Sequence, residues 1–281
     1  MTHASLFSGI GGFDLAAEWA GWTNAFNCEI DSFCRKVLKY HFPDAEQYED
    51  IKKSDFSKWR DRIDVLTGGF PCQPFSLAGK RKGTEDDRYL WPEMLGVIRT
   101  IQPRWAVGEN VYGIVNWSDG MVFDTVCSDL EAAGYEVQPY IIPACGVGAP
   151  HRRDRCWFVA HRADTGIETM REGKDDLYAD EYVAHADSQR CEECNTSEKS
   201  SQMQGLSIQN GNGKRRIPDW SGFPTESPVC DRNDGFPGGL AGLSFPAWCR
   251  ESIKACGNAI VPQVALQIFK TIEEYETKQL R

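Results

Sequence analysis

The feature that most constrains the fold is an alternation of short apolar runs with helical patterns through residues 1–160. The runs have the length of buried strands, and the patterns between them have the spacing of amphipathic helices. Strands and helices that alternate in this way form an α/β fold, with a doubly wound, mostly parallel sheet and helices on both faces. The sequence predicts strands at 4–7, 24–28, 63–66, 105–107 and 156–159, and helices at 14–19, 32–40, 90–101, 122–133 and 264–278.

In such a sheet, ligands bind beyond the carboxyl ends of the strands. Three chemically unusual segments follow predicted strands: the glycine turn after Phe7, the turn that carries Cys72, and the residues around Glu109. We therefore expect these three segments to face one cleft.

The composition is that of an ordinary folded protein. Hydrophobic residues make up 41% and charged residues 26% of the 281 residues, which is enough for a substantial core. The chain contains no run of about 18 apolar residues and no basic leader before an apolar signal core. Its 11 cysteines are spread over a long chain without an export signal. We expect a soluble cytoplasmic protein with reduced thiols.

The net charge of −10 argues against a protein that coats nucleic acid, although a local basic face can still bind phosphates. Each basic cluster taken alone is typical of a solvated loop, so its position relative to the other motifs decides its meaning. The clusters are Lys80-Arg81-Lys82, His151-Arg152-Arg153 with Arg155, and Lys214-Arg215-Arg216.

The segment Gly68-Gly69-Phe70-Pro71-Cys72-Gln73-Pro74 presents a cysteine on a turn framed by glycine and proline. The prolines restrict the backbone on both sides, so the sulfur is held at one accessible position. That pose favours nucleophilic attack over packing, while a small buried cysteine in an ordinary turn is the structural alternative.

The segment Phe7-Ser8-Gly9-Ile10-Gly11-Gly12 lies between the first strand and the first helix. Glycines there let a ligand approach the backbone and the helix N-terminus. Asp14 stands where a dinucleotide fingerprint has its third glycine, so that fingerprint is not met. Glu29 is placed to accept hydrogen bonds from ribose hydroxyls, and Asp50 is a candidate acceptor for an adenine amino group.

Glu109 follows a predicted strand and faces the same cleft as Cys72. A buried glutamic acid can hold or deliver a proton near neutrality, because desolvation raises its pKa. Arg153 and Arg155 alternate along what we expect to be one short extended segment. Alternation would put both guanidinium groups on one face, where they could steady a thiolate, hold a base edge or bind a phosphate.

These motifs occur in the order found in the DNA (cytosine-5)-methyltransferases of prokaryotic or phage type, and the chain resembles that family over nearly its whole length. His151 departs from the family pattern, which has glutamine there. The matching segments are Phe7-Ser8-Gly9-Ile10-Gly11-Gly12, Glu29, Asp50-Ile51, Gly69-Phe70-Pro71-Cys72-Gln73, Asp87-Arg88 with Leu90, Glu109-Asn110-Val111, Pro150-His151-Arg152-Arg153-Asp154-Arg155, and Gly257-Asn258 to Ala265.

The resemblance implies a Rossmann-like, S-adenosylmethionine-dependent enzyme that methylates cytosine C5 at a specific sequence in double-stranded DNA. Cys72 would add as a thiolate to C6 of a flipped-out base, and Glu109 would stabilise or protonate N3. Arg155 would contact the base near O2, and Arg153 would support the thiolate or a phosphate. The implied cofactor contacts are Phe7, Gly9, Gly11, Gly12, Glu29, Ile30, Asp50, Ile51, Pro71, Leu90, Asn258 and Ile260.

The chain would divide into a catalytic and cofactor-binding domain, residues 1–162 plus 245–281, and a small target-recognition region, residues 163–244. The second is polar and loop-rich, especially from Ala163 to Asp234. We expect a basic lid at Lys80, Arg81 and Lys82, and phosphate contacts from Lys214, Arg215 and Arg216. Cys191 and Cys194, even with His185 and Cys230, lack a second tight pair, so no metal site is predicted.

The expected partner is double-stranded DNA, and a cognate restriction endonuclease is a second possible partner. We expect a monomeric enzyme in the cytoplasm of a prokaryotic cell or a phage-infected host. Three alternatives stay open. A tRNA substrate is one, although the Cys-Phe-Thr signature of that branch is absent from the sequence. A catalytically silent relative is disfavoured by intact Cys72, Glu109 and Arg153. A nicotinamide-dependent redox enzyme is disfavoured by the broken dinucleotide fingerprint.

Overall fold

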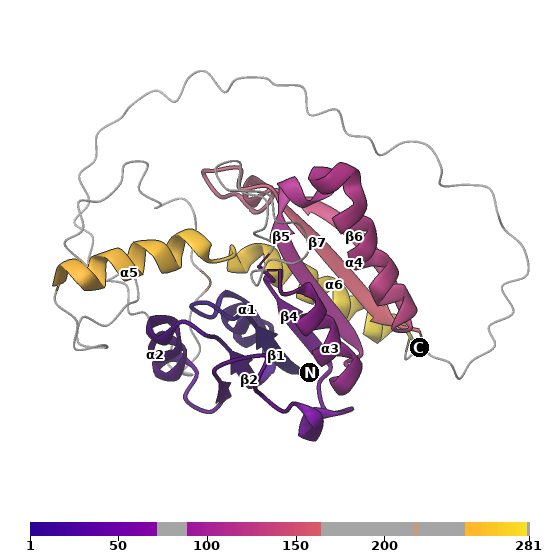
Figure 1. The fold of residues 1–281 in the computed structure, drawn as a ribbon, viewed down its shortest axis with the longest axis horizontal. Coiled ribbons are helices and arrows are strands. Elements are labelled where there is room, and N and C mark those ends of the chain that lie inside the picture. The colour runs from indigo at the N-terminus through magenta and orange to yellow at the C-terminus, as the bar shows by residue number, and fades with distance from the viewer. Residues whose placement is uncertain (72–88, 164–216, 218–244, 280–281) are drawn as a thin grey trace, which may run out of the picture. The chain divides into compact units, whose positions relative to one another are not determined.

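The computed structural model describes residues 1–71, 89–163, 217 and 245–279 (Figure 1). The strands in these residues are β1 (Thr2–Leu6), β2 (Thr23–Cys28), β3 (Glu46–Tyr48), β4 (Val65–Gly68), β5 (Trp105–Val111), β6 (Tyr135–Ile142) and β7 (Arg155–Arg162). The α-helices are α1 (Gly12–Ala20), α2 (Ser32–His41), α3 (Trp91–Ile101), α4 (Met121–Ala132), α5 (Phe245–Asn258) and α6 (Pro262–Gln279). Three 3-10 helices join them, η1 (Ser57–Trp59), η3 (Tyr112–Gly120) and η4 (Ala144–Val147).

The strands form one sheet in the order β3-β2-β1-β4-β5-β7-β6 (Figure 1). The pairs β1–β2, β2–β3, β1–β4 and β4–β5 are parallel, whereas β7 is antiparallel to both β5 and β6. The predicted doubly wound, mostly parallel α/β sheet is therefore confirmed, with one reversed strand inserted near its edge.

Two strands, β3 and β6, and the α-helix α5 were missing from the sequence prediction. Only Tyr135 of the edge strand β6 is buried, and the strand contains Pro139 and polar residues, so it lacks a continuous apolar run. Helix α5 follows the polar stretch directly, and its Ala255 packs against Phe33, Cys34 and Val37 of α2. The predicted domain boundaries, 1–162 plus 245–281 and 163–244, stay a prediction.

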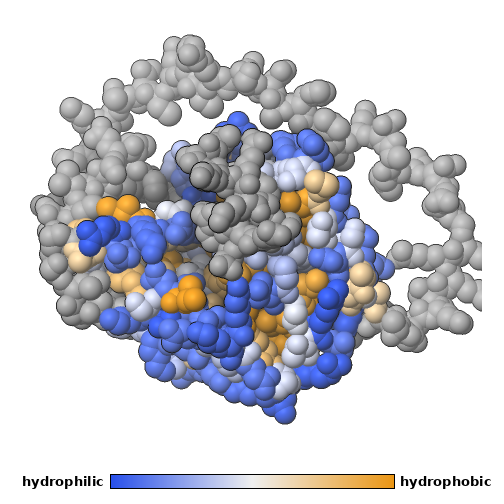
Figure 2. Space-filling view, in the orientation of Figure 1, coloured by the Kyte–Doolittle hydropathy of each residue, from blue (hydrophilic) through white to orange (hydrophobic). Residues whose placement is uncertain are grey.

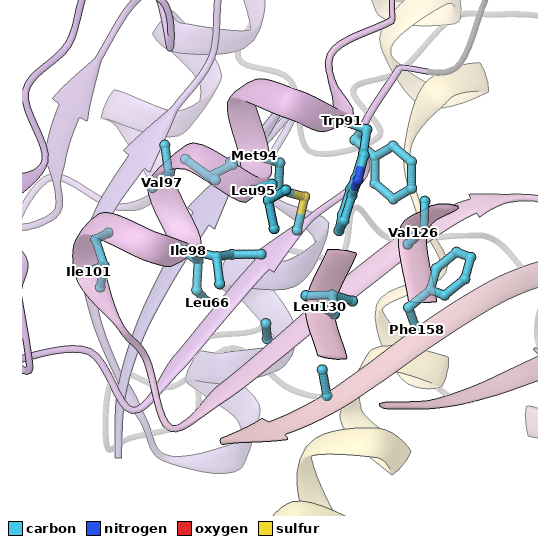
Figure 3. Close-up of a cluster of buried hydrophobic side chains, with 14 of the residues drawn as sticks. Leu66, Trp91, Met94, Leu95, Val97, Ile98, Ile101, Val126, Leu130 and Phe158 are labelled. Carbon is cyan, nitrogen blue, oxygen red and sulfur yellow. The ribbon is translucent and has the colours of Figure 1, made fainter. Parts of the chain in front are cut away.

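Helices cover the sheet on both faces. On one face, α3 and α4 pack on β4, β5 and β7, and Figure 3 shows Ile98, Leu130 and Phe158 among the side chains of this layer. On the other face, α1 and α6 pack on Val65 and Trp157. Both faces of the central strands are therefore buried, and this fixes their carboxyl ends relative to one another.

In the view of Figure 2, hydrophilic residues dominate the described surface and hydrophobic residues appear as separate patches. Within the described part of the chain, no helix has both the length and the apolar character needed to cross a membrane.

Candidate active site

A cleft of about 1200 Å³ opens where the carboxyl ends of the parallel strands meet. Segments that follow β1, β2 and β4 form its wall together with the end of β5, as the strand order predicts. The predicted site residues that line it are Phe7, Gly9, Glu29, Ile30, Asp50, Ile51, Pro71, Leu90, Glu109, Arg153, Arg155 and Asn258.

A buried polar network fixes the chain where it leaves β1. The Ser5 hydroxyl donates to the carboxylate of Asp14 at 2.9 Å and lies 2.7 Å from the Ser8 hydroxyl. Ser8 Oγ accepts a hydrogen bond from the Cys28 amide at 3.1 Å. Asp14, which breaks the dinucleotide fingerprint, is thus a buried anchor of the glycine turn, a role that the sequence pattern did not reveal.

Glu29 joins this turn to the start of α2. Its Oε2 accepts from the Gly9 amide at 2.7 Å, and its Oε1 accepts from the Asp31 amide at 2.7 Å. Burial raises the pKa of Glu29, while these two backbone hydrogen bonds act in the opposite direction. A carboxylate offers about four lone-pair sites, so Glu29 can still accept hydrogen bonds from a ribose diol.

Gly11 and Gly12 have packing roles and do not line the cleft. A Cβ on Gly11 would lie 2.5 Å from Cε2 of Phe42, and a Cβ on Gly12 would lie 2.6 Å from Cγ1 of Ile260. These glycines let α2 and the turn before α6 approach the first helix closely. Ligand contacts by Gly11, Gly12 and Ile260 stay predictions.

The part of the cleft wall that follows β2 and β3 combines apolar side chains with a carboxylate. Ile30 lines it with 68% of its surface exposed, and Ile51 and Leu90 are also in the wall. Asp50 accepts a hydrogen bond from the Lys52 amide at 3.0 Å, which is the main reason its pKa is lowered. Apolar faces next to a fixed acceptor suit a nucleobase, so these residues could hold the base of a nucleoside-containing cofactor.

Glu109 lies inside β5, which continues to Val111, so the prediction that it follows the strand is wrong. Arg155, at the start of β7, pairs across the sheet with Val111 and donates from Nε to Glu109 Oε1 at 2.9 Å. Desolvation raises the pKa of Glu109, and the charges of Arg155 and Arg153 oppose that rise. A Cβ on Gly69 would lie 3.2 Å from Glu109 Oε2, so the glycine leaves room for this carboxyl group.

Asn110 ties β5 to the segment that precedes Cys72. It is only 4% exposed, its Nδ2 donates to the Phe70 carbonyl at 2.9 Å, and its Oδ1 accepts from the Val111 amide at 2.9 Å. Asn110 is part of the Glu109-Asn110-Val111 motif, but the sequence alone assigned it no role. One sequence signal could have pointed to this role. Side chains alternate along a strand, so the neighbour of Glu109 faces the opposite side of the sheet and not the cleft.

Arg153 contradicts the expectation of one extended segment. Its φ is +41°, and β7 begins only at Arg155. Its Nη2 donates to the carbonyls of Gly257 at 2.9 Å and Ala259 at 2.6 Å. Both arginines line the cleft, but a left-handed turn, not strand alternation, brings them there.

A sequence model described as C-5 cytosine-specific DNA methylase matches residues 1–233. The chain belongs to this family. Among curated relatives of this family member, the type II methyltransferase M.Eco47II of Escherichia coli is 37% identical over 166 residues, 58% of this chain and 40% of that protein. The type II methyltransferase M.HpaII of Haemophilus parainfluenzae is 37% identical over 173 residues, 60% of this chain and 48% of that protein.

The aligned part of the chain spans less than half the length of these two relatives. Among solved structures, a mutant of Spodoptera frugiperda DNMT2 is 24% identical, covers 62% of this chain and 53% of its own, and has a TM-score of 0.50. That likeness supports the fold alone.

The remaining predicted site residues lie outside the part of the chain that the structure describes. They are Cys72, Lys80, Arg81, Lys82, Lys214, Arg215 and Arg216. The same holds for Cys191 and Cys194. Within the residues that are described, no group of three or more His, Cys, Asp or Glu side chains could hold a metal ion.

Proposed function

We propose that the protein transfers a methyl group from S-adenosylmethionine to C5 of cytosine, at a specific sequence in double-stranded DNA. The observation that carries this proposal is that one cleft is lined by Glu29 and Ile30, which suit a nucleoside, and by the acid Glu109, whose side chain is only 12% exposed. Phe70 and Pro71, which lead to Cys72, line the same cleft. Methyl transfer to a base needs both a donor site and a base site within one cleft.

Glu29 and Asp50 would accept hydrogen bonds from the ribose and the adenine of the cofactor. Ile30 and Leu90 would cover the apolar surface of the base, and Asn258 lines the same cleft. S-adenosylmethionine supplies an electrophilic methyl group when bound, and S-adenosylhomocysteine is its product.

The chain's own residues would make cytosine reactive. C5 of cytosine is a poor nucleophile. Attack of the Cys72 thiolate on C6 forms a carbon–sulfur bond, and a proton held by Glu109 at N3 directs electron density to C5. After transfer, loss of the C5 proton and release of Cys72 from C6 restore the aromatic ring.

The environment of Glu109 supports that role. Burial raises its pKa and so favours the protonated form, while the charges of Arg155 and Arg153 act in the opposite direction. Arg155 orients the carboxyl group through Oε1. The target base would have to leave the duplex, at a cost of a few kcal/mol. The basic residues Lys80, Arg81 and Lys82 would form the lid that closes over the DNA.

Incubation with DNA and labelled S-adenosylmethionine, followed by mapping of methylcytosines, tests the proposal. We expect label at C5 of cytosine within one short recurring sequence. Cys72→Ser should abolish turnover, whereas Cys145→Ser is the matched control because Cys145 is an exposed free thiol. Label that enters only RNA or adenine would contradict the proposed reaction, and full turnover by Cys72→Ser would contradict the covalent mechanism.

The two curated relatives carry the name type II methyltransferase. By analogy, a cognate restriction endonuclease is a candidate partner, and this stays a prediction together with the monomeric state and the cytoplasmic location.

A further inference from the structure

The end of α5 and the turn that follows it form part of the cleft wall. A residue that belongs to neither α5 nor α6 holds them in place. Gly257 and Asn258 line the cleft. The two carbonyl groups that accept hydrogen bonds from Arg153 Nη2, those of Gly257 and Ala259, flank Asn258 on either side. One guanidinium nitrogen therefore fixes the peptide units around Asn258.

Arg153 occupies a strained and incompletely paired position. A φ of +41° is uncommon for a residue with a side chain and marks a position for which a functional reason is sought. Glu109 is hydrogen-bonded to Arg155 and not to Arg153. Among the described residues, the buried Nε of Arg153 has no hydrogen-bond partner. A solvated surface arginine would have neither this backbone conformation nor a buried Nε, so Arg153 is not a simple surface residue.

The same turn has a second anchor on its other side. Ile260 packs so closely against Gly12 that a Cβ there would lie 2.6 Å from Cγ1 of Ile260. The Ala259 amide donates to the Ala255 carbonyl at 3.0 Å and so continues the hydrogen bonding of α5. The turn is therefore held between the glycine turn after β1 and the segment before β7.

We propose that Arg153 is a positioning residue for the methyl donor and not a contact to DNA. Its two hydrogen bonds hold Asn258 in place in the cleft wall, next to the donor's binding site. The identity of that ligand rests on the proposed function. Arg155, which orients Glu109, lies two residues further along, so one short segment sets the geometry of both the donor site and the base site.

The test compares Arg153→Ala and Arg153→Lys with Arg152→Ala in the full chain. Arg152 is the matched control, because it is the adjacent arginine, its side chain is 77% exposed, and it pairs with Asp154 at 2.9 Å and not with the turn around Asn258. Three readouts apply: the Kd of S-adenosylhomocysteine by calorimetry, separate KM values for S-adenosylmethionine and DNA, and hydrogen exchange of residues 255–261 without ligand.

We expect Arg153→Ala to weaken binding of S-adenosylhomocysteine by about tenfold or more, which corresponds to about 1.4 kcal/mol. The KM for S-adenosylmethionine should rise by a similar factor, the KM for DNA should change little, and exchange at residues 257–261 should accelerate. Arg153→Lys should recover part of the affinity because an ammonium group can still donate to a carbonyl oxygen. Arg152→Ala should match the wild type.

An unchanged Kd for S-adenosylhomocysteine in Arg153→Ala would overturn the proposal. A rise confined to the KM for DNA would show instead that Arg153 contacts DNA. An equal loss for both ligands together with a lower Tm would indicate a general structural role and would also overturn it. If the wild type binds S-adenosylhomocysteine but methylates no DNA, the proposed function fails while the effect of Arg153 on binding still stands.

Discussion

His3 makes the stability of the protein depend on pH in a predictable way. It lies in β1 and is 0% exposed, with Nδ1 2.6 Å from Asn24 Oδ1 and Nε2 3.0 Å from Thr67 Oγ1. Burial lowers the pKa of His3 from 6.5 to about 4, and the hydrogen bond to Asn24 opposes this only in part. The native state therefore contains neutral His3.

The sign of the effect follows from proton linkage. Between pH 6.5 and about 4 the unfolded chain binds a proton at His3 and the native protein does not, so acid favours unfolding. Stability from His3 is complete above pH 6.5 and is lost as the pH falls through this window. The fall from pH 7 to pH 5 should remove about 2 kcal/mol of the free energy of unfolding, and the full loss below pH 4 should reach about 3 kcal/mol.

The assay is urea unfolding at a series of pH values for the wild type, His3→Gln and His151→Gln. His3→Gln removes the titrating group and keeps a polar side chain, so its stability should depend less on pH, by about 2 kcal/mol between pH 7 and pH 5. His151 is exposed, so His151→Gln should follow the wild-type curve. Parallel curves for the wild type and His3→Gln would refute the assignment of a neutral, desolvated His3.

Three further outcomes follow from the cleft and its supports. Asn110→Ala should lower kcat and reduce the free energy of unfolding by about 1–3 kcal/mol, because the buried Phe70 carbonyl loses its hydrogen-bond donor. An unchanged kcat with DNA and labelled cofactor would contradict this. Glu109→Gln should reduce kcat by about 10²–10⁴-fold with little change in S-adenosylhomocysteine affinity, and comparable losses in both would refute a role confined to the base. Gly12→Ala should destabilise the protein by about 1–3 kcal/mol through overpacking against Ile260, and the double variant with Ile260→Ala should recover part of that loss in chemical denaturation.

The prediction of the fold succeeded where strands are buried on both faces. All four positions of β4 are buried, and its apolar residues Val65 and Leu66 belong to the short apolar segment that marks this strand in the sequence. The prediction failed for β6 because this edge strand buries only Tyr135 and so has no continuous apolar run in the sequence. It also could not show that β7 runs antiparallel between β5 and β6, since strand direction depends on the connection and leaves no mark in the strand's composition.

The candidate site divides in the same way. The glycine turn, Glu29 and Glu109 were identified from residue type and from their position near strand ends, and the structure places Phe7 and Gly9 of that turn, Glu29 and Glu109 around one cleft. The roles of Asn110 and Arg153 were not identified, because their hydrogen bonds reach partners 40 and 104 residues away. The Cys72 turn lies outside the described residues, so its geometry stays a prediction.

By itself, the sequence determined the α/β class, the family and the chemical types available at the carboxyl ends of the strands. Those follow from local periodicity and from motifs whose spacing is fixed along the chain. Tertiary structure alone decided that Arg155 pairs with Glu109, that Arg153 holds the turn around Asn258, and that Gly11 and Gly12 serve packing. The physical reason is that ion pairs, carbonyl contacts and side-chain clearances depend on distances between segments, which arise only when the sheet and its helices pack together.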